Sequence, residues 1–178
     1  MTHKSLSRGK DKEYRVLIGG NVKVIPRDIF NKQNDIDGVI RIVDMEYSGI
    51  DTTKNKYTHF NLEHSGHKVG GIYVLPRIVQ PGYYRNEDDK QSPVLSFDNC
   101  LVMKCVAVRE NVPYSALSPG DFTNAMSFIR SVEDLQKVIV RRYRRILPDV
   151  PEDKMLSLGV SITTLEILKD RKFVLKIN

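Results

Sequence analysis

Three histidines close together in the sequence are the residues best suited to metal chemistry. His59, His64 and His67 lie within nine residues, and a turn between the last two could bring their imidazoles together, with Glu63 or a distant cysteine completing a tetrahedral zinc site. Zinc needs four ligands, or three and a water, and no cysteine pair lies nearby. Histidines in a polar turn are also ordinary surface residues. We therefore expect no metal and no other cofactor, and these histidines are the one candidate for a zinc site.

Acidic residues and glycine pairs offer little that resembles a catalytic site. Asp44, Glu46 and Asp51 could form the paired carboxylates of a hydrolase, but nothing distinguishes them from ordinary solvated acids. The glycine pairs at 19–20 and 70–71 lie beside strand-like runs, whereas a phosphate-binding loop opens a helix. The sequence contains no Walker A motif, no nucleophile elbow and no His-Glu-x-x-His zinc motif. These observations predict a protein that is not an enzyme.

A cationic helix near the C-terminal end is the strongest physical signal. Residues 137–145 carry five positive charges and no negative one. In a helix over 132–147 the apolar residues share one face, and four cations lie on the opposite arc: Lys137, Arg141, Arg144 and Arg145. A solvated face would show the same pattern, and cations near a helix C-terminus also complement its dipole. Arginines, however, favour bidentate binding of phosphate or carboxylate, so we favour a surface for an anionic partner.

The N-terminal residues 1–13 form a second basic stretch with few apolar residues, which is typical of a flexible arm. Its cations are Lys4, Arg8, Lys10 and Lys12. Together with the cationic helix, this arm could hold RNA or the negatively charged leaflet of a membrane.

The polar segment 80–93 is expected to be an exposed loop with acidic and aromatic side chains. Its candidate contact residues are Tyr83, Tyr84, Glu87, Asp88 and Asp89. Because acids here complement the basic stretches, head-to-tail association of copies of the chain is allowed.

Short apolar runs with turn residues between them predict the sheet that must position these groups. The predicted strands are 14–18, 22–25, 38–45, 57–63, 69–75 and 100–109. Helices follow: one begins at Ser118-Pro119-Gly120-Asp121, with Phe122, Met126 and Ile129 at helical spacing, and the next covers 132–147. Runs at 158–168 and 173–177 predict a closing hairpin.

Composition supports one domain over residues 14–178. The chain has 178 residues, a net charge of +6 and 40% hydrophobic residues, which suffice for one core. Cys100 and Cys105 should lie on opposite faces of one strand, too far apart to form a disulfide. No secretory signal or long apolar run is present, so we expect synthesis in the cytosol. We predict an α+β fold with a central antiparallel sheet, two helices in the C-terminal half, a closing hairpin and the basic arm.

Residues 70–85 read Gly-Gly-Ile-Tyr-Val-Leu-Pro-Arg-Ile-Val-Gln-Pro-Gly-Tyr-Tyr-Arg. This strand, which runs into Leu-Pro, a basic residue and a proline-containing loop, resembles the middle of a rhabdovirus matrix protein. The following order of strand 101–109, helix 132–147 and terminal hairpin is also similar, so the resemblance covers about residues 69–178. Departures are the missing Pro-Pro-x-Tyr motif, a shorter arm and a first helix reduced to 28–33, which suit a short, plant-infecting type of member.

The resemblance implies a non-enzymatic structural protein of a virion that self-associates, condenses the viral nucleocapsid and lines the inner face of the envelope. The expected partners are copies of the chain, nucleocapsid or RNA, and an anionic membrane surface, with the tail of the viral glycoprotein as a further candidate. The expected location is the virion beneath its envelope, and in the host the cytoplasm and the membrane periphery. The basic arm and the arginine helix would supply the family's cationic surfaces.

A second resemblance leaves an alternative open. Residues 38–44, Gly-Val-Ile-Arg-Ile-Val-Asp, are similar to the core of plant-virus movement proteins of the 30K type. That resemblance implies cooperative binding of single-stranded RNA. The predicted helix and hairpin after Ser118 fit it poorly.

Overall fold

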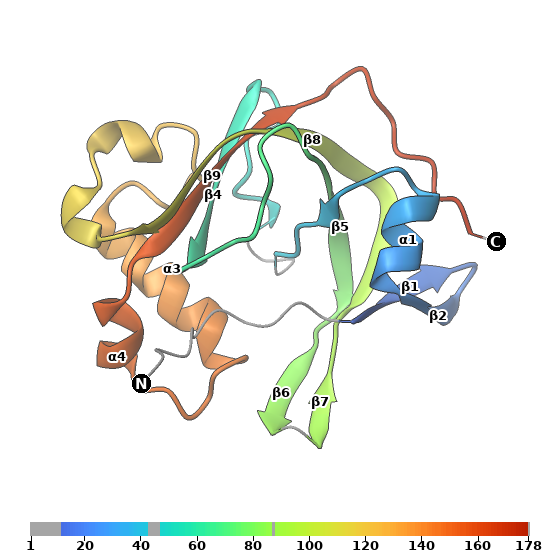
Figure 1. The fold of residues 1–178 in the computed structure, drawn as a ribbon, viewed down its shortest axis with the longest axis horizontal. Helices are drawn as coiled ribbons and strands as arrows, with labels where there is room; N and C mark the ends of the chain where they lie inside the picture. Colours follow the sequence, from blue (N-terminus) through green and yellow to red (C-terminus); the bar gives the residue numbers. More distant parts are fainter. Residues whose placement is uncertain (1–11, 43–46, 87, 178) are drawn as a thin grey trace.

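A computed structural model describes residues 12–42, 47–86 and 88–177 of the chain. It has the α+β architecture that the sequence predicts, in which a mixed sheet carries helices at its two ends (Figure 1). The elements in chain order are β1 Glu13–Ile18, β2 Asn21–Pro26, α1 Arg27–Gln33, β3 Gly38–Val39, β4 Lys56–Leu62, β5 Ile72–Gln80, β6 Tyr83–Asn86, β7 Asp89–Gln91, β8 Val94–Val112, two 3₁₀ turns at Tyr114–Ala116 and Pro119–Phe122, α3 Val132–Arg144, α4 Glu152–Ser157 and β9 Val160–Ile167.

Strand β8 organises the sheet because three strands pair with it. Its 19 residues pair with β1 near the start, with β5 over the first half and with β9 over the second half. The register shifts between Cys105 and Ala107 and between Arg109 and Val112. Such bulges increase the local twist of a strand. In Figure 1 the strand arches across the molecule, so one continuous element joins the two ends of the fold.

The pairing pattern is mixed rather than purely antiparallel. The pairs β1–β2, β4–β9, β5–β8 and β8–β9 are antiparallel, as expected. The pairs β1–β8 and β3–β5, however, are parallel. Each parallel pair joins segments that are distant in the sequence, and nothing in the local pattern of either segment specifies such a partner.

Two separate cores lie against opposite faces of the central strands. The larger one packs β4, β9 and α3 against residues such as Leu75 and Cys105, while the smaller one includes Val74 and Leu95. The half-buried Cys100 packs on the smaller core, and both cysteines are free thiols. The prediction that Cys100 and Cys105 lie on opposite faces of one strand is therefore confirmed, because their odd spacing changes the face.

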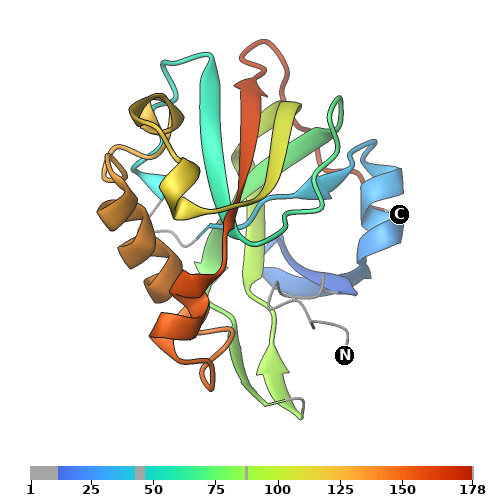
Figure 2. The ribbon, with the colours of Figure 1, turned by 60° about the vertical axis from the view of Figure 1, so that its left-hand side comes forward.

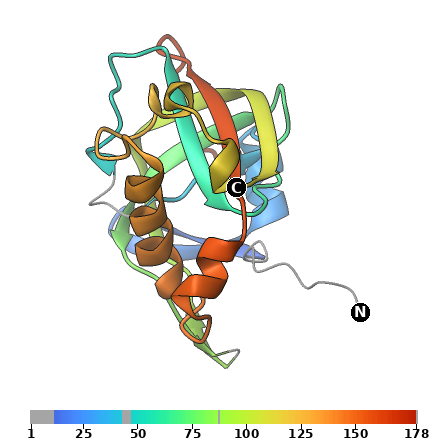
Figure 3. The same ribbon diagram turned by 90° about the vertical axis from the view of Figure 1, so that its left-hand side faces the viewer.

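Helix α3 forms as its start signal predicts, and it ends slightly earlier, at Arg144. The Ser131 side chain accepts a hydrogen bond from the Asp134 backbone N–H at 3.2 Å, which is the expected N-cap. Its buried face includes Leu135, Ile139 and Tyr143. In Figure 3, α3 and α4 lie side by side on one side of the molecule.

The helix predicted after Ser118 is wrong beyond its first turn. Ser118 and Asp121 form the expected capping box, but only the 3₁₀ turn Pro119–Phe122 follows. The Asn124 carbonyl accepts a hydrogen bond from the Thr58 backbone N–H at 2.8 Å, so this backbone bonds to β4 rather than to its own next turn. Met126 is nevertheless buried. The apolar spacing of this segment therefore predicted the buried residues correctly, but the helix that it predicted does not form.

The prediction of a closing hairpin is also wrong, because residues 173–177 form no strand beside β9. This segment crosses to the smaller core instead, where Phe173 packs on Phe97 with ring centroids 5.5 Å apart. The Asn34 side chain anchors it by accepting from the Lys176 backbone N–H at 2.7 Å. Its alternating apolar side chains therefore do share one face, but that face is half-buried and packs on the smaller core.

The segment expected to be an exposed loop contains a small second sheet, formed by β6 and β7. This hairpin extends away from the body of the molecule (Figures 1 and 2). Helices α1 and α4 occupy connectors, and of these the sequence predicted only α1, as the short stretch 28–33. Within the described residues, none of the helices combines the length and apolarity needed to cross a bilayer.

Helix α1 closes the smaller core through one aromatic side chain, which makes its contribution testable. Phe30 is fully buried and packs on Tyr14 and Phe97 with ring centroids at 5.3 and 5.0 Å. Phe30→Ala should lower the free energy of unfolding by about 3–5 kcal/mol, measured by urea denaturation. Ile29→Ala is the matched control, because Ile29 is half exposed on the same helix. Equal losses in both variants would contradict this packing.

Candidate anion-binding cavity and cationic surfaces

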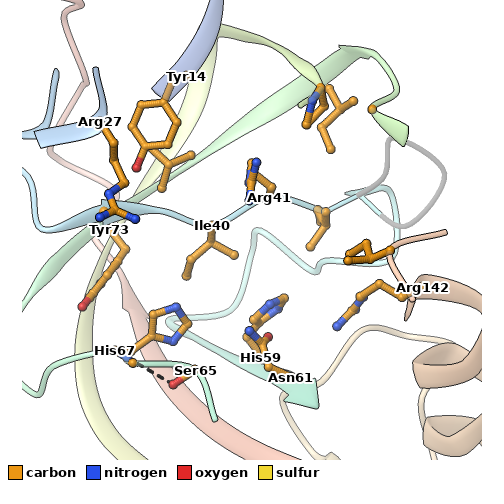
Figure 4. A pocket seen from close by; sticks show the side chains of 18 of the residues that line it. Tyr14, Arg27, Ile40, Arg41, His59, Asn61, Ser65, His67, Tyr73 and Arg142 are labelled. Carbon is orange, nitrogen blue, oxygen red and sulfur yellow. Dashed lines mark hydrogen bonds between the residues drawn. The ribbon is translucent and has the colours of Figure 1, made fainter. Parts of the chain in front are cut away.

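A cavity of about 450 Å³ lies where several parts of the fold meet. Its walls come from β1, α1, the β3 segment, β4 with the loop at 64–68, β5, the base of the β6–β7 hairpin and the end of α3. Figure 4 shows side chains from these elements pointing into a common space. Cavities of this size are typical of sites for small molecules.

Positive charge dominates the wall of the cavity. Its cationic residues are Arg27, Arg41, Lys68, Arg142 and Arg145. Among the described residues the carboxylates on the wall are Asp28 and Asp37, so the described part of the lining carries an excess of three positive charges when its histidines are neutral. An enclosed excess of one sign concentrates counter-ions more strongly than the same charges on an open surface.

Both carboxylates of the wall already have contacts. Asp28 lies 3.6 Å from Nε of Arg27, and its side chain is almost fully exposed to solvent. Asp37 accepts a hydrogen bond from the Ile72 backbone N–H at 2.7 Å. The contacts of these two acids therefore lie at the ends of the wall formed by α1 and by the start of the β3 segment.

Two buried polar atoms on the α1 side of the wall have no hydrogen-bond partner within the described residues. They are Nη1 of Arg27, a donor, and Oδ1 of Asn31, an acceptor. Buried polar groups in folded proteins are nearly always hydrogen-bonded, so each such atom calls for an explanation. Arg142, on the opposite wall, donates through Nη1 to the Phe60 carbonyl at 2.5 Å, which fixes its guanidinium beside β4.

The histidines lie at different depths rather than around one point. His59 is buried and bonded to the Tyr57 hydroxyl at 2.7 Å, whereas His64 is exposed and lies 3.2 Å from Glu110. His67 contacts the Thr163 hydroxyl at 2.8 Å and packs edge-on against Tyr73. Among the described residues, no three His, Cys, Asp or Glu side chains are grouped as a metal ion would require.

Burial sets the protonation state of His59. Desolvation holds the pKa of His59 well below its ordinary value, and the charges of Arg142 and His67 lower it further, while Asn61 acts in the opposite direction. The imidazole is therefore neutral at pH 7. A neutral His59 adds no charge to the lining, so the arginines and Lys68 carry the positive potential.

The two thiols are poorly suited to nucleophilic chemistry. Burial raises the pKa of Cys100 to about 11 and also raises the pKa of Cys105. Because the thiolate is the reactive form, both residues remain protonated and unreactive at neutral pH.

The acids considered for a paired-carboxylate site are not assembled into one. Asp44 and Glu46 lie outside the described residues. Asp51 is exposed and accepts hydrogen bonds from the Thr53 hydroxyl and backbone N–H, which lower its pKa. Its contacts are those of an ordinary surface turn.

The cationic face of α3 is exposed as predicted, although an acid of the same helix and one of α4 contact part of it. Lys137 lies 3.5 Å from Glu133, and Arg144 lies 3.1 Å from Glu152 of α4. The Arg141 guanidinium lies over the Phe128 ring. Arg145 is exposed and also lines the cavity. This face is therefore less purely cationic than the helix sequence alone implies.

The β6–β7 hairpin is less acidic than the sequence suggests, because basic side chains fold over it. Arg85 stacks on Tyr83 at 4.8 Å and reaches Asp89 at 3.1 Å. Lys90 lies over the Tyr84 ring. Asp88 is exposed, and Glu87 lies outside the described residues. What the hairpin presents is thus a mixed aromatic and charged surface, with Tyr83 41% exposed.

Most of the predicted basic arm lies outside the described residues, including Lys4, Arg8 and Lys10. Lys12 belongs to the start of the fold, since its carbonyl accepts from the Arg27 backbone N–H at 2.9 Å. The structure therefore places this residue beside β2 and α1.

Sequence reasoning missed the three arginines that enter the cavity from different elements, namely Arg27, Arg41 and Arg142. Of the three, Arg142 could most readily have been identified from the sequence, because on a helical wheel it falls between the cationic arc and the buried face. The residues on either side of it, Arg141 and Tyr143, show this directly, since one is exposed and the other buried. No local signal marked Arg27 or Arg41.

The buried neutral His59 predicts an acid sensitivity. The unfolded chain binds a proton near pH 6.5, whereas folded His59 resists protonation, so stability falls as the pH drops below 6.5. The slope should approach about 1.4 kcal/mol per pH unit at most. His59→Gln should remove this part of the change in urea midpoint between pH 7 and pH 5, whereas the exposed His64→Gln should retain it. An unchanged pH dependence in His59→Gln would refute the assignment.

Comparison with known proteins leaves the function to be argued from this geometry. No protein-family model matches the chain, and neither a curated protein nor a solved structure matches it.

Proposed function

We propose that this chain is a non-enzymatic structural protein of the viral matrix type. In this proposal it self-associates, condenses a viral nucleocapsid and binds the inner, anionic face of an envelope membrane. Its location would be the virion beneath the envelope, and the host cytoplasm and membrane periphery before assembly.

The observation that carries the proposal is the exposed cationic face of α3. Its opposite face is buried against the sheet, so the helix is held rigidly while its cations face solvent. The exposed cations are Lys137, Arg141, Arg144 and Arg145. A rigid array of this kind suits a surface of repeated negative charges, such as a lipid leaflet or an RNA backbone.

A non-enzymatic role agrees with the chemistry of the described residues. The cysteines are held as thiols, His59 is held neutral by burial, and the histidines do not converge on one point. The groups that do converge are cations, which bind anions without needing a nucleophile or a general base.

The cationic face can be tested with vesicles that contain phosphatidylserine. Replacing Arg141, Arg144 and Arg145 together by Gln should weaken co-sedimentation about a hundredfold, because each removed charge contributes roughly 1 kcal/mol near an anionic leaflet. Wild-type binding should fall as salt rises, and fall again when residues 1–11 are removed. The melting temperature should change by less than about 3 °C, since exposed charges contribute little to folding.

The matched control removes three exposed cations from other elements: Lys23→Gln, Lys32→Gln and Lys172→Gln. This variant has the same net charge as the arginine variant but an intact α3. Equal weakening in both variants would show that only the overall charge matters and not the face of α3. Binding of the wild type that does not depend on lipid charge would refute the proposed binding to an anionic membrane. Tight, cooperative binding of bare single-stranded RNA without lipid binding would support the movement-protein alternative instead.

Self-association through the β6–β7 hairpin can be tested separately. Tyr83 is exposed, and tyrosine side chains commonly anchor protein interfaces. Tyr83→Ser should raise the dissociation constant for self-association about tenfold, measured by analytical ultracentrifugation over a range of concentrations. Val174→Ser, which removes a more exposed apolar side chain elsewhere, should leave the constant unchanged. The same constant in both variants would exclude the hairpin as an interface.

A further inference from the structure

We propose that segment 173–177 is exchanged between copies of the chain, so that the segment of one copy occupies the docking site of another. The docking site consists of Asn34, which follows α1, and Phe97 of β8, and in this structure the chain's own segment occupies it. This inference rests on the self-association in the proposed function and names one contact that would produce it.

The docking site binds the backbone of the segment through one buried side chain. Asn34 is 8% exposed, and its Oδ1 accepts from the Lys176 N–H at 2.7 Å while its Nδ2 donates to the Lys176 carbonyl at 3.2 Å. The same Nδ2 donates to the Phe30 carbonyl at 2.9 Å, which fixes the amide in place. An amide that pairs with both backbone groups of one residue acts as a neighbouring strand would, and it does not depend on the side chain at that position.

Apolar side chains supply the second part of the contact. Phe173, Leu175 and Ile177 pack on the smaller core, while Val174 and Lys176 between them are exposed. This alternation is what an extended segment shows when one of its faces is covered. The docking site is therefore suited to an extended segment with apolar residues at every second position.

The segment is held weakly enough to leave the docking site. Its apolar side chains are half-buried, and among the described residues Asn34 is the one hydrogen-bond partner of residues 173–177. Segments with few buried contacts and few backbone hydrogen bonds open at a small fraction of the free energy of global unfolding. The link at 169–172 is exposed over all four residues, so it can change direction without uncovering the core.

A second copy of the chain is the occupant that fits an opened docking site. Opening exposes the docking site and the segment together, and exchange between two copies restores every contact that either copy lost. Charge favours the same partner. Residues 169–177 carry four positive charges and one negative charge, whereas the exposed Asp35 and Asp98 directly adjoin Asn34 and Phe97. Opposite charges around a contact favour encounter of the two surfaces.

The chain's own segment competes with the segment of a neighbour. A short flexible link holds it at an effective concentration of the order of millimolar, so exchange is weak in dilute solution. Exchange becomes favourable when copies are packed at a comparable density, as in the layer of the proposed function. This contact therefore responds to local concentration, which suits a protein that assembles on a surface.

Two full-length variants separate exchange from a purely internal role of the segment. The segment variant, Phe173→Ser with Leu175→Ser, keeps the docking site, whereas the site variant, Asn34→Ala, keeps the segment. Mixed in equal amounts, they should associate at least about tenfold more tightly than the wild type does with itself. The reason is that the empty site of one variant takes the free segment of the other without internal competition. Analytical ultracentrifugation with one variant fluorescently labelled measures the mixed species.

Val174→Ser mixed with the site variant is the matched control. The Val174 side chain is 72% exposed, so this copy keeps its own segment in its docking site and should associate no more tightly than the wild type. A mixture of segment and site variants that associates no more tightly than the control pair would overturn the proposal.

A synthetic peptide of residues 169–178 keeps the test decisive if the site variant does not fold. The peptide should bind the segment variant at least about tenfold more tightly than the wild type, whose docking site is occupied, as measured by fluorescence polarisation. Leu175→Ser alone provides a milder segment variant. The peptide carrying Phe173→Ser and Leu175→Ser should bind neither protein. Equal affinities of the unchanged peptide for the segment variant and the wild type would overturn the exchange.

Failure of this proposal is distinguishable from failure of the matrix-type function. The segment variant keeps the exposed face of α3, so it should bind phosphatidylserine vesicles as the wild type does. If vesicle binding and the effect of Tyr83→Ser persist while the mixed variants fail to associate, only the exchange is refuted. Tight association of the mixed variants without vesicle binding by the wild type would support the exchange and refute the membrane role.

Discussion

The pairing of β8 with three other strands is the constraint on which the rest of this structure depends. Strand β5 pairs with its first half, β9 with its second half and β1 with its start. Leu95 and Phe97 of β8 pack in the smaller core and Met103 and Cys105 in the larger one, so the strand needs a cover on each face. One cover is α3 with β4, and the other is α1 with the segment at 173–177. The cavity is lined from both covers, by α1 on one side and by the end of α3 on the other. The convergence of arginines is thus a consequence of how the sheet is closed.

Local signals in the sequence were sufficient wherever neighbouring residues decide the structure. The N-cap pair Ser131 and Asp134 predicted the start of α3, and the glycines at 19–20, both with positive φ, predicted the β1–β2 turn. The odd spacing of Cys100 and Cys105 predicted their opposite faces. Each of these features depends on a few successive residues, for which backbone geometry and hydrogen bonding leave few alternatives.

The predictions failed where a distant segment competes for the same backbone groups. The stretch after Phe122 has apolar side chains at helical spacing. Its Asn124 carbonyl, however, accepts a hydrogen bond from β4, and no helix follows. The stretch around Phe173 alternates like a strand, but Phe97 and Asn34 draw it to the smaller core. The cavity was unpredictable for the same reason, since its arginines come from three segments that only the sheet brings together. Periodicity reports which side chains become buried, and it does not identify what buries them.

Helix α3 illustrates why the position of a charge matters more than the number of charges. Cations at the end of a helix are stabilised by its dipole, so five of them within residues 137–145 do not by themselves require a partner. The structure divides them by environment. Lys137 and Arg144 lie beside glutamates, and Arg142 turns inward to the Phe60 carbonyl. Glu152 comes from α4, which packs beside α3, so the same packing that fixes the helix also lowers the charge of its outer face. Arg145 is exposed and also lines the cavity, so this residue connects the cationic face of α3 with the cavity.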